Sequence, residues 1–312
     1  MKLFLIILAS VTGIVILVES GLRLLWGLGN PPLYIPDEEI GYLLKPNQKL
    51  RRMGNQILIN QYSMRNEAIA SDKPATTFRV MLLGDSIVNG GWWTDQDETL
   101  STLLERQIET NLAQNRTVEV LNVSANSWSP RNQLAYLQRF GLFEADILIL
   151  VINTDDLFGI LPTPLPVGRE KNYPDQKPPL ALIELYNQKF GKNQSIPEFE
   201  KIKQESGDRV GKILTAIKEI KILATEQNTQ FIVAMTPLLR ETKEKEQRDY
   251  EKEARKRLQD FAKTENLIYL DFLPIFQDFP QPEFLYRDHI HLSPQGNALV
   301  TEKLSQFVQE KL

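Results

Sequence analysis

Two short groups of residues carry the side chains needed for acyl transfer by a serine nucleophile. A Gly-Asp-Ser sequence ends at Ser86, and Asp288 precedes His291 by three residues. Histidine is suited to taking a proton from a serine hydroxyl at neutral pH, and a neighbouring carboxylate holds the imidazole in the required tautomer. The two histidines of the chain are His289 and His291, so histidine-dependent chemistry is confined to this region. The three-residue spacing from Asp288 favours His291 as the base, and we expect His289 to take no part.

The composition excludes several other chemistries. The chain contains no cysteine, which rules out a disulfide framework, a thiolate zinc site, an iron–sulfur cluster and a cysteine nucleophile. Its 36 Lys and Arg against 40 Asp and Glu give a formal charge of −4, whereas a nucleic-acid-binding protein normally shows a basic face. We therefore expect no nucleic-acid partner, no metal and no organic cofactor.

Ser86 and His291 lie far apart in the sequence, so the fold must bring them together. Apolar runs typical of buried strands alternate with segments of helical periodicity from residue 78 onward. Strands are expected at 78–83, 118–123, 145–152, 231–235 and 267–272, and helices at 99–112, 132–140, 210–220, 240–264 and from 293 onward. This alternation predicts a five-stranded parallel sheet between two helical layers, a three-layer α/β/α sandwich. Ligands of such sheets bind beyond the carboxyl ends of the strands, where Ser86 directly follows the first strand.

Together, Gly84-Asp85-Ser86 and the Asp288-x-x-His291 sequence before the last helix resemble the first and last motifs of the GDSL or SGNH hydrolase family. The resemblance covers residues from about 78 to 312. It implies the flavodoxin-like SGNH fold and hydrolysis of an ester without a cofactor. Ser86 would be the nucleophile, His291 the base and Asp288 the residue that orients His291. Residues 41–47 and 60–65 are also similar to the membrane-proximal arm of envelope-anchored members.

The middle motifs depart from the family pattern. The family has a glycine after the second strand and an asparagine after the third, and both donate hydrogen bonds to the oxyanion. Ser127 stands nearest the glycine position and keeps its backbone N–H, so that the oxyanion hole would combine the N–H groups of Ser86 and Ser127. Asp155 aligns with the asparagine, and an ionised carboxylate has no hydrogen to donate. Asn153 lies two residues earlier and could face the same way, and Asn126 is another candidate donor.

The first 77 residues differ in character from the rest. Residues 3–18 carry no charge, so residues 1–29 are expected to form a signal anchor, with Lys2 favouring a cytoplasmic N-terminus. A signal peptide cleaved before Gly21 is the alternative. Residues 30–77 are expected to be an extended, partly packed connecting arm, and residues 78–312 the hydrolase-like domain. Both alternatives place this domain outside the cytoplasm, in the periplasm or at the cell surface.

A proline-rich insertion at about 157–207 interrupts the alternation after the third strand. A connection of this length next to the predicted site is typical of a functional loop, and we expect a flap that faces the substrate. Trp92, Trp93 and Trp128 are expected near the mouth of the site, where they would stack on a sugar ring or anchor the core.

The sequence thus predicts a membrane-tethered serine hydrolase that cleaves an acyl or acetyl ester, on an envelope carbohydrate or a lipid. Two alternatives use the same fold. One is a polysaccharide O-acyltransferase with the same triad. The other is a non-catalytic carbohydrate-binding or assembly protein, which the carboxylate at Asp155 would favour.

Overall fold

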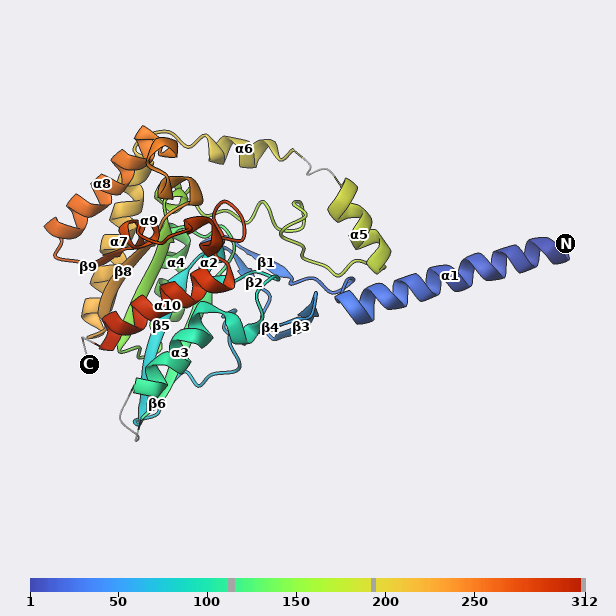
Figure 1. Ribbon diagram of the computed structural model, residues 1–312, viewed down its shortest axis with the longest axis horizontal. Coiled ribbons are helices and arrows are strands. Elements are labelled where there is room, and N and C mark those ends of the chain that lie inside the picture. The colour runs from blue at the N-terminus through green and yellow to red at the C-terminus, as the bar shows by residue number, and fades with distance from the viewer. Residues whose placement is uncertain (112–115, 192–194, 310–312) are drawn as a thin grey trace.

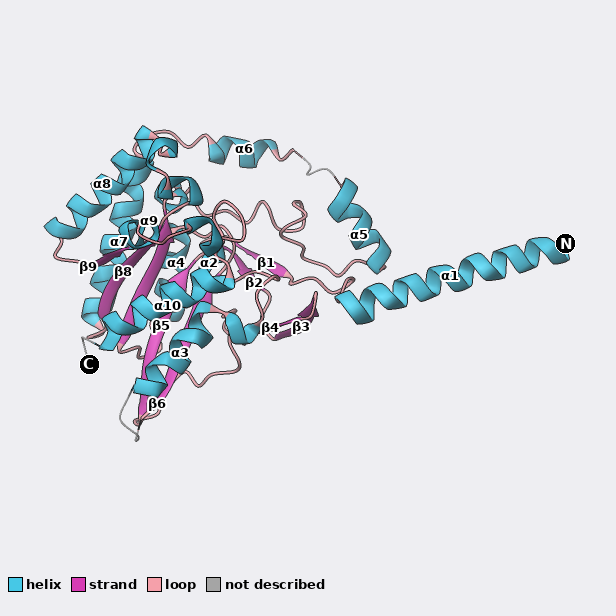
Figure 2. Cartoon of the chain, in the orientation of Figure 1, coloured by secondary structure: helices cyan, strands magenta, loops and turns pink. Residues whose placement is uncertain are grey.

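Five parallel strands form the central sheet of the computed structural model, which describes residues 1–111, 116–191 and 195–309 (Figures 1 and 2). They are β5 (Thr77–Gly84), β6 (Thr117–Ser124), β7 (Ile147–Asn153), β8 (Gln230–Thr236) and β9 (Ile268–Asp271). Their order in the sheet is β6-β5-β7-β8-β9, and each neighbouring pair is parallel. β5 and β7 are buried on both faces, which explains their unbroken apolar runs. The predicted five-stranded parallel sheet is confirmed.

Helices cover both faces of this sheet. On one face lie α3 (Leu100–Asn111), α9 (Phe272–Gln277) and α10 (Pro294–Gln309), and on the other α4 (Pro130–Phe140), α7 (Arg209–Glu226) and α8 (Asp249–Thr264). Successive side chains of a strand point to opposite faces. Accordingly, Val80 and Leu82 of β5 pack on the α3 and α10 side, whereas Met81 and Leu83 pack on the other. The predicted three-layer α/β/α sandwich is confirmed.

The register of the strands aligns their carboxyl ends at one edge of the sheet. Gly84 at the end of β5 pairs with Ser124 at the end of β6. Asn153 at the end of β7 pairs with Thr236 at the end of β8. The loops that leave these four strands therefore start at the same level, and those after β5, β6 and β7 contribute residues to the candidate site.

Two predicted boundaries after β8 are wrong. The helix expected over 240–264 begins only at Asp249, because residues 239–246 form two short 3₁₀ helices, Leu239–Thr242 and Glu244–Glu246. Glu241 is buried there and accepts hydrogen bonds from the Leu238 N–H and the Thr154 hydroxyl, which holds this segment against the sheet edge. The last strand ends at Asp271, whose carboxylate caps α9 by accepting from the Leu273 N–H.

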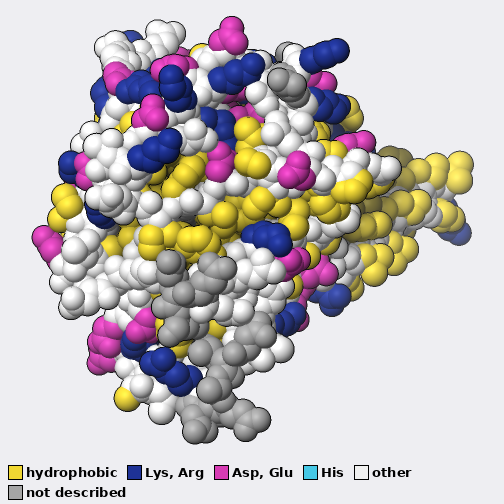
Figure 3. Space-filling model, turned by 60° about the vertical axis from the view of Figure 1, so that its left-hand side comes forward, with side chains coloured by type: hydrophobic (Ala, Val, Ile, Leu, Met, Phe, Trp, Pro, Cys, Tyr) yellow, Lys and Arg dark blue, Asp and Glu magenta, His cyan; other side chains and the backbone are white. Residues whose placement is uncertain are grey.

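The N-terminal helix α1 (Lys2–Trp26) projects from the domain, and Figure 3 shows it covered with hydrophobic side chains. Within the described residues it is the one helix that is long and apolar enough to span a membrane, a test that a signal sequence would also pass. Two antiparallel hairpins follow, where the sequence suggested only an extended arm. Their strands are β1 (Tyr34–Asp37), β2 (Gly41–Leu44), β3 (Gln48–Arg52) and β4 (Asn55–Ile59).

Arg65, in the segment after these hairpins, forms hydrogen bonds to the loop that follows Ser86. Its buried guanidinium donates to the backbone carbonyls of Asn89 at 2.7 Å and Thr94 at 2.5 Å, and also to that of Gly91. Burial lowers the pKa of Arg65 to about 10, which leaves it charged at neutral pH. The segment before the sheet thus supports the loop beside the candidate nucleophile.

The proline-rich insertion contains helices that the sequence did not reveal. It holds α5 (Ala181–Phe190) and α6 (Pro197–Lys203), and the 3₁₀ helix Asp155–Phe158 lies at its start. The remaining short elements are α2 (Ser86–Asn89) and the 3₁₀ helices Gln96–Glu98 and Pro282–Leu285.

Candidate active site

Ser86 lies at a tight turn between β5 and the short helix α2. Asp85 caps α2, because its carboxylate accepts a 2.8 Å hydrogen bond from the Ile87 N–H. A Cβ atom at Gly84 would lie 2.4 Å from Val88 Cγ2 and 3.1 Å from the Val151 carbonyl oxygen, so this position of the turn has room only for glycine. The turn places Ser86 in the wall of a cavity at the carboxyl edge of the sheet.

The structure brings Ser86, His291 and Asp288 together in one hydrogen-bonded chain. Ser86 Oγ lies 3.0 Å from His291 Nε2, and His291 Nδ1 lies 2.7 Å from Asp288 Oδ2. Both distances fit a hydroxyl that donates to an imidazole whose other nitrogen donates to a carboxylate. The three residues predicted to cooperate from their types and spacing are therefore in contact.

Asp288 is held as a carboxylate by its own loop. Burial opposes ionisation, but Asp288 Oδ1 accepts from the backbone N–H groups of His291 at 2.8 Å and Ile290 at 2.9 Å. These bonds and the His291 side chain lower the pKa of Asp288 below its ordinary value. The carboxylate is therefore ionised at neutral pH and can orient His291.

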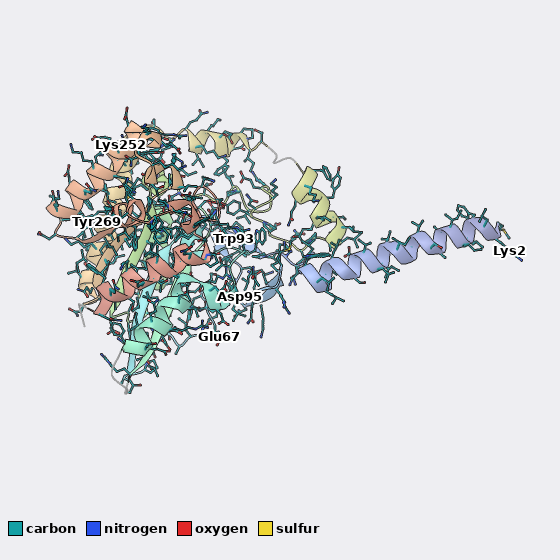
Figure 4. The ribbon with its side chains drawn as sticks, in the orientation of Figure 1. Lys2, Glu67, Trp93, Asp95, Lys252 and Tyr269 are labelled. Atoms are coloured by element: carbon teal, nitrogen blue, oxygen red, sulfur yellow. The ribbon has the colours of Figure 1, made fainter. Side chains whose placement is uncertain are left out.

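His291 and His289 have different surroundings. The indole of Trp93 packs edge-on against the His291 ring, with centroids 4.6 Å apart, and Figure 4 shows Trp93 beside the start of α10. His289 has 74% of its side chain exposed, and its Nδ1 lies 3.9 Å from Asp288. Of the two, the structure joins His291 and not His289 to Ser86.

The cavity beside Ser86 has a volume of about 520 Å³, and the proline-rich insertion forms much of its wall. Tyr42 of β2 and Ser127 also line it. The insertion contributes residues 158–163, Pro166, Glu170, Tyr173, Phe199 and Lys203. The three tryptophans expected at the mouth are not among the described residues that line the cavity, and Trp128 is instead buried, with its indole N–H donating to the Tyr42 carbonyl at 3.0 Å.

Ser127 has a left-handed backbone conformation. Its φ of 59° lies in the left-handed region that glycine adopts most easily. Its hydroxyl accepts a 2.9 Å hydrogen bond from the Tyr173 hydroxyl, which ties Ser127 to the insertion. Ser127 and Ser86 line the same cavity, so the backbone N–H of Ser127 remains a candidate oxyanion donor.

The structure does not favour Asn153 as an oxyanion donor. Its buried amide nitrogen donates to Asp85 Oδ2 at 2.9 Å and to Asp156 Oδ2 at 3.0 Å, which engages both of its hydrogens. Asn126 is not among the described residues that line the cavity. Asp155 does line it, with 54% of its side chain exposed and Oδ1 3.9 Å from Arg240 Nη2. No side-chain amide thus replaces the expected one among these three residues.

Asp85, Asn153 and Asp156 form a buried polar cluster that the sequence analysis missed. Burial raises the pKa of Asp85 to about 6. Burial and the neighbouring Asp85 raise the pKa of Asp156 well above its ordinary value. The position of Asp156 just after the third strand was the available signal, but its burial depends on packing. Two neighbouring buried carboxylates disfavour ionisation of both at once.

Replacing Asp156 with asparagine is expected to stabilise the fold at pH 8 by about 1–2 kcal/mol, because a buried charge is removed while one oxygen can still accept the Asn153 bonds. An acid whose pKa is raised by folding does not lower the free energy of unfolding below its unfolded pKa. Above that pKa, the free energy of unfolding falls as the pH rises toward the folded pKa. The gain should therefore largely vanish at pH 4. Urea unfolding of both proteins at the two pH values measures it, and an equal gain at both would contradict the raised pKa.

The chain was also compared with known proteins. The model of the GDSL-like lipase/acylhydrolase family matches residues 82–299. No curated protein matches the chain.

Solved structures similar to the chain include the acetyl xylan esterase AlAXEase, at 14% identity and a TM-score of 0.48, with 74% of this chain and 100% of that chain covered. The lipase/acylhydrolase from Enterococcus faecalis has 15% identity and a TM-score of 0.46, with 75% and 97% covered. A member of the lipolytic protein G-D-S-L family from Veillonella parvula has 12% identity and a TM-score of 0.45, with 73% and 97% covered. Identities and scores in this range assign no substrate.

Proposed function

The chain belongs to the GDSL-like lipase/acylhydrolase family and is an ester-hydrolysing enzyme, and on this premise we propose a membrane-tethered esterase that uses Ser86, His291 and Asp288. The observation that carries the assignment of the residues is the hydrogen-bonded chain from Ser86 through His291 to Asp288. Ser86 and His291 line the cavity at the carboxyl edge of the sheet, where an ester can approach the serine.

The proposed reaction has two steps. His291 Nε2 takes the proton of Ser86 as Oγ attacks the carbonyl carbon, and then gives it to the departing alcohol oxygen as the ester bond breaks. Water then attacks the acyl-serine, with His291 accepting a proton from water and returning it to Ser86 Oγ as the acid leaves. Asp288 keeps His291 Nδ1 protonated and oriented in both steps.

The oxyanion would be held by backbone N–H groups. Ser86 supplies one from the first turn of α2, and we propose Ser127 as the second, since its left-handed conformation reproduces the backbone of a glycine. The third donor of the family is replaced by Asp155, whose negative charge would oppose the developing oxyanion. Hydrolysis is therefore expected to be slower than a site with three donors allows.

Helix α1 would anchor the enzyme in a membrane, with residues 30–77 as the connecting arm and residues 78–312 as the catalytic domain outside the cytoplasm. The apolar surface of α1 is not buried against the domain, which supports this role. The substrate we propose is an acyl or acetyl ester of an envelope carbohydrate or a lipid. Its reacting group would enter between Ser86 and the apolar wall that Phe158, Ile160 and Phe199 contribute.

The enzyme reading is tested by exposing the purified full-length protein to a fluorophosphonate and to a small acetyl ester. We expect covalent labelling of Ser86 and turnover of the ester. If neither labelling nor turnover is observed, the catalytic proposal is wrong and a binding protein on the same fold is favoured. A rise of acyl transfer over hydrolysis on adding a polysaccharide would instead identify an acyltransferase.

Substituting Asp155 with asparagine is expected to raise kcat for a small acetyl ester by about tenfold, because the amide can donate to the oxyanion. The salt bridge to Arg240 that is lost is long and half exposed, so little stability should be lost with it. Asp155→Ala serves as the matched control, since it removes the charge without adding a donor and should raise kcat less. Equal rates for wild type and both variants would show that residue 155 does not face the oxyanion.

A further inference from the structure

Helix α5 of the proline-rich insertion exposes an apolar face that the described residues leave uncovered. Ile183, Tyr186 and Phe190 recur at helical spacing along this face, and 63% of Tyr186 and 68% of Phe190 is exposed. The rings of Tyr186 and Phe190 pack against each other, with centroids 5.4 Å apart. Exposed apolar faces of this kind mark sites that contact another apolar phase.

The opposite face of α5 is fixed to the domain-proximal end of α1. Ala181 of α5 forms a small buried cluster with Leu22 and Leu28. Glu19 of α1 accepts hydrogen bonds from the N–H groups of Ala181 at 2.8 Å and Leu182 at 3.1 Å. These contacts set the start of α5 at the level of Glu19 along α1. Figure 1 shows α5 running across the direction of α1 rather than along it.

The length of α1 places this level at the surface of a bilayer. The uncharged stretch has 16 residues, Leu3 to Val18, which span about 24 Å at 1.5 Å per residue. A hydrocarbon core of about 30 Å needs about 20 residues and would therefore extend to about Leu22. Glu19, which the start of α5 contacts, would then lie about 4.5 Å inside this limit, close to the boundary between hydrocarbon and headgroups.

The charges near this level suit the headgroup region. Arg23 pairs with Glu19 at 2.6 Å, which compensates this carboxylate, and also donates to the Pro179 carbonyl at 2.9 Å. Arg23 and Arg51 line a second cavity of about 210 Å³, together with Leu24 and Leu25. Guanidinium groups beside apolar side chains are suited to lipid phosphates over acyl chains.

We propose that α5 is an interfacial helix that lies on the membrane entered by α1, with Ile183, Tyr186 and Phe190 inserted among the lipids. Amphipathic helices at this position bury their apolar face about 5–10 Å into the boundary between headgroups and acyl chains. With α1 and α5 both held by the bilayer, the catalytic domain has a fixed orientation, and the insertion that walls the cavity is kept at the membrane surface. The proposal rests on the membrane tether of the proposed function, but not on catalysis.

The absence of cysteine allows single-cysteine labelling of the full chain without first replacing native cysteines. Ile183→Cys, Phe190→Cys, Val11→Cys and Lys252→Cys are each labelled with an environment-sensitive fluorophore. The proteins are reconstituted in vesicles of phosphatidylcholine and phosphatidylglycerol that contain spin-labelled lipid quenchers. Val11 is an exposed side chain of α1 and reports the tether. Lys252 lies on α8, far from α1 in Figure 4, and is the matched control.

We expect lipid quenching of the labels at Ile183 and Phe190 to exceed that at Lys252 by at least about threefold. Lipids that carry the spin label near the headgroup should quench these two labels most. Strong quenching at Val11 with none at Ile183 or Phe190 would overturn the interfacial helix while leaving the tether intact. No quenching at Val11 would remove the tether and the interfacial helix together. A blue-shifted emission at Phe190 without lipid quenching would identify a protein surface, such as a second copy of the chain, and would also overturn the proposal.

Discussion

Replacing Ser86 with alanine is expected to lower kcat for a small acetyl ester by about 10⁴–10⁶-fold, the loss that follows removal of a serine nucleophile. The hydroxyl is the atom 3.0 Å from His291 Nε2, and alanine offers nothing for the base to activate. Binding and the backbone donors remain, so a small residual rate is expected to survive. Initial rates of ester hydrolysis by the two purified proteins measure the difference.

The same substitution should leave the fold intact. The Ser86 side chain contributes one hydroxyl at the cavity wall, and the His291 nitrogen it leaves can be solvated from the cavity, so the free energy of unfolding should change by no more than about 1 kcal/mol. Ser71→Ala, at an exposed serine that is not among the described residues lining the cavity, is the matched control for a loss of activity or stability unrelated to the site. Retained turnover or retained fluorophosphonate labelling in Ser86→Ala would identify a different nucleophile and end the assignment.

The contact between Ser86 and His291 was predictable because it follows from topology. Continuous apolar runs such as residues 147–153 can be buried only in a sheet covered on both faces. In a parallel sheet the loops after the strands meet at one edge, so a serine after β5 and a histidine before α10 converge there. Because the two histidines of the chain are separated by a single residue, little choice of base was left.

The polar environment of Ser86 was not predictable in the same way. The amide of Asn153 donates to Asp85 and Asp156, which engages both of its hydrogens. That orientation depends on which carboxylates are buried at the strand ends, a property of packing that no spacing in the sequence encodes. The burial of Glu241, which delays the start of α8, has the same origin.

The region before the sheet also had weak sequence signals. The strands β1 to β4 have four or five residues each and one of them contains a proline, so their periodicity is too short to recognise. In the structure this region supports the site, because Arg65 holds the loop of residues 89–94 whose Trp93 packs on His291. Residues 30–77 are thus coupled to His291, the proposed base, through one buried guanidinium.

Replacing Asp288 with asparagine is expected to lower kcat by about 10³–10⁴-fold, because the amide of asparagine favours the wrong tautomer of the histidine. The wild-type carboxylate accepts from His291 Nδ1 and from two backbone N–H groups, and these contacts keep its pKa below the ordinary value. A carboxylate with a lowered pKa stays ionised, and so keeps orienting the histidine, until the pH falls through that pKa. Asp288 should therefore cause no loss of rate between neutral pH and about pH 4.

His289→Ala is the matched control for this loop, because it removes the neighbouring imidazole and leaves Asp288 and His291 in place. We expect kcat to change by less than about threefold, as for other exposed residues without a contact to the reacting groups. His291→Ala should match the loss in Ser86→Ala, since nucleophile and base act as one unit and their effects do not add. If His289→Ala lowered kcat as much as His291→Ala, the assignment of His291 as the base would be wrong. The three-residue spacing from Asp288 would then not identify the base.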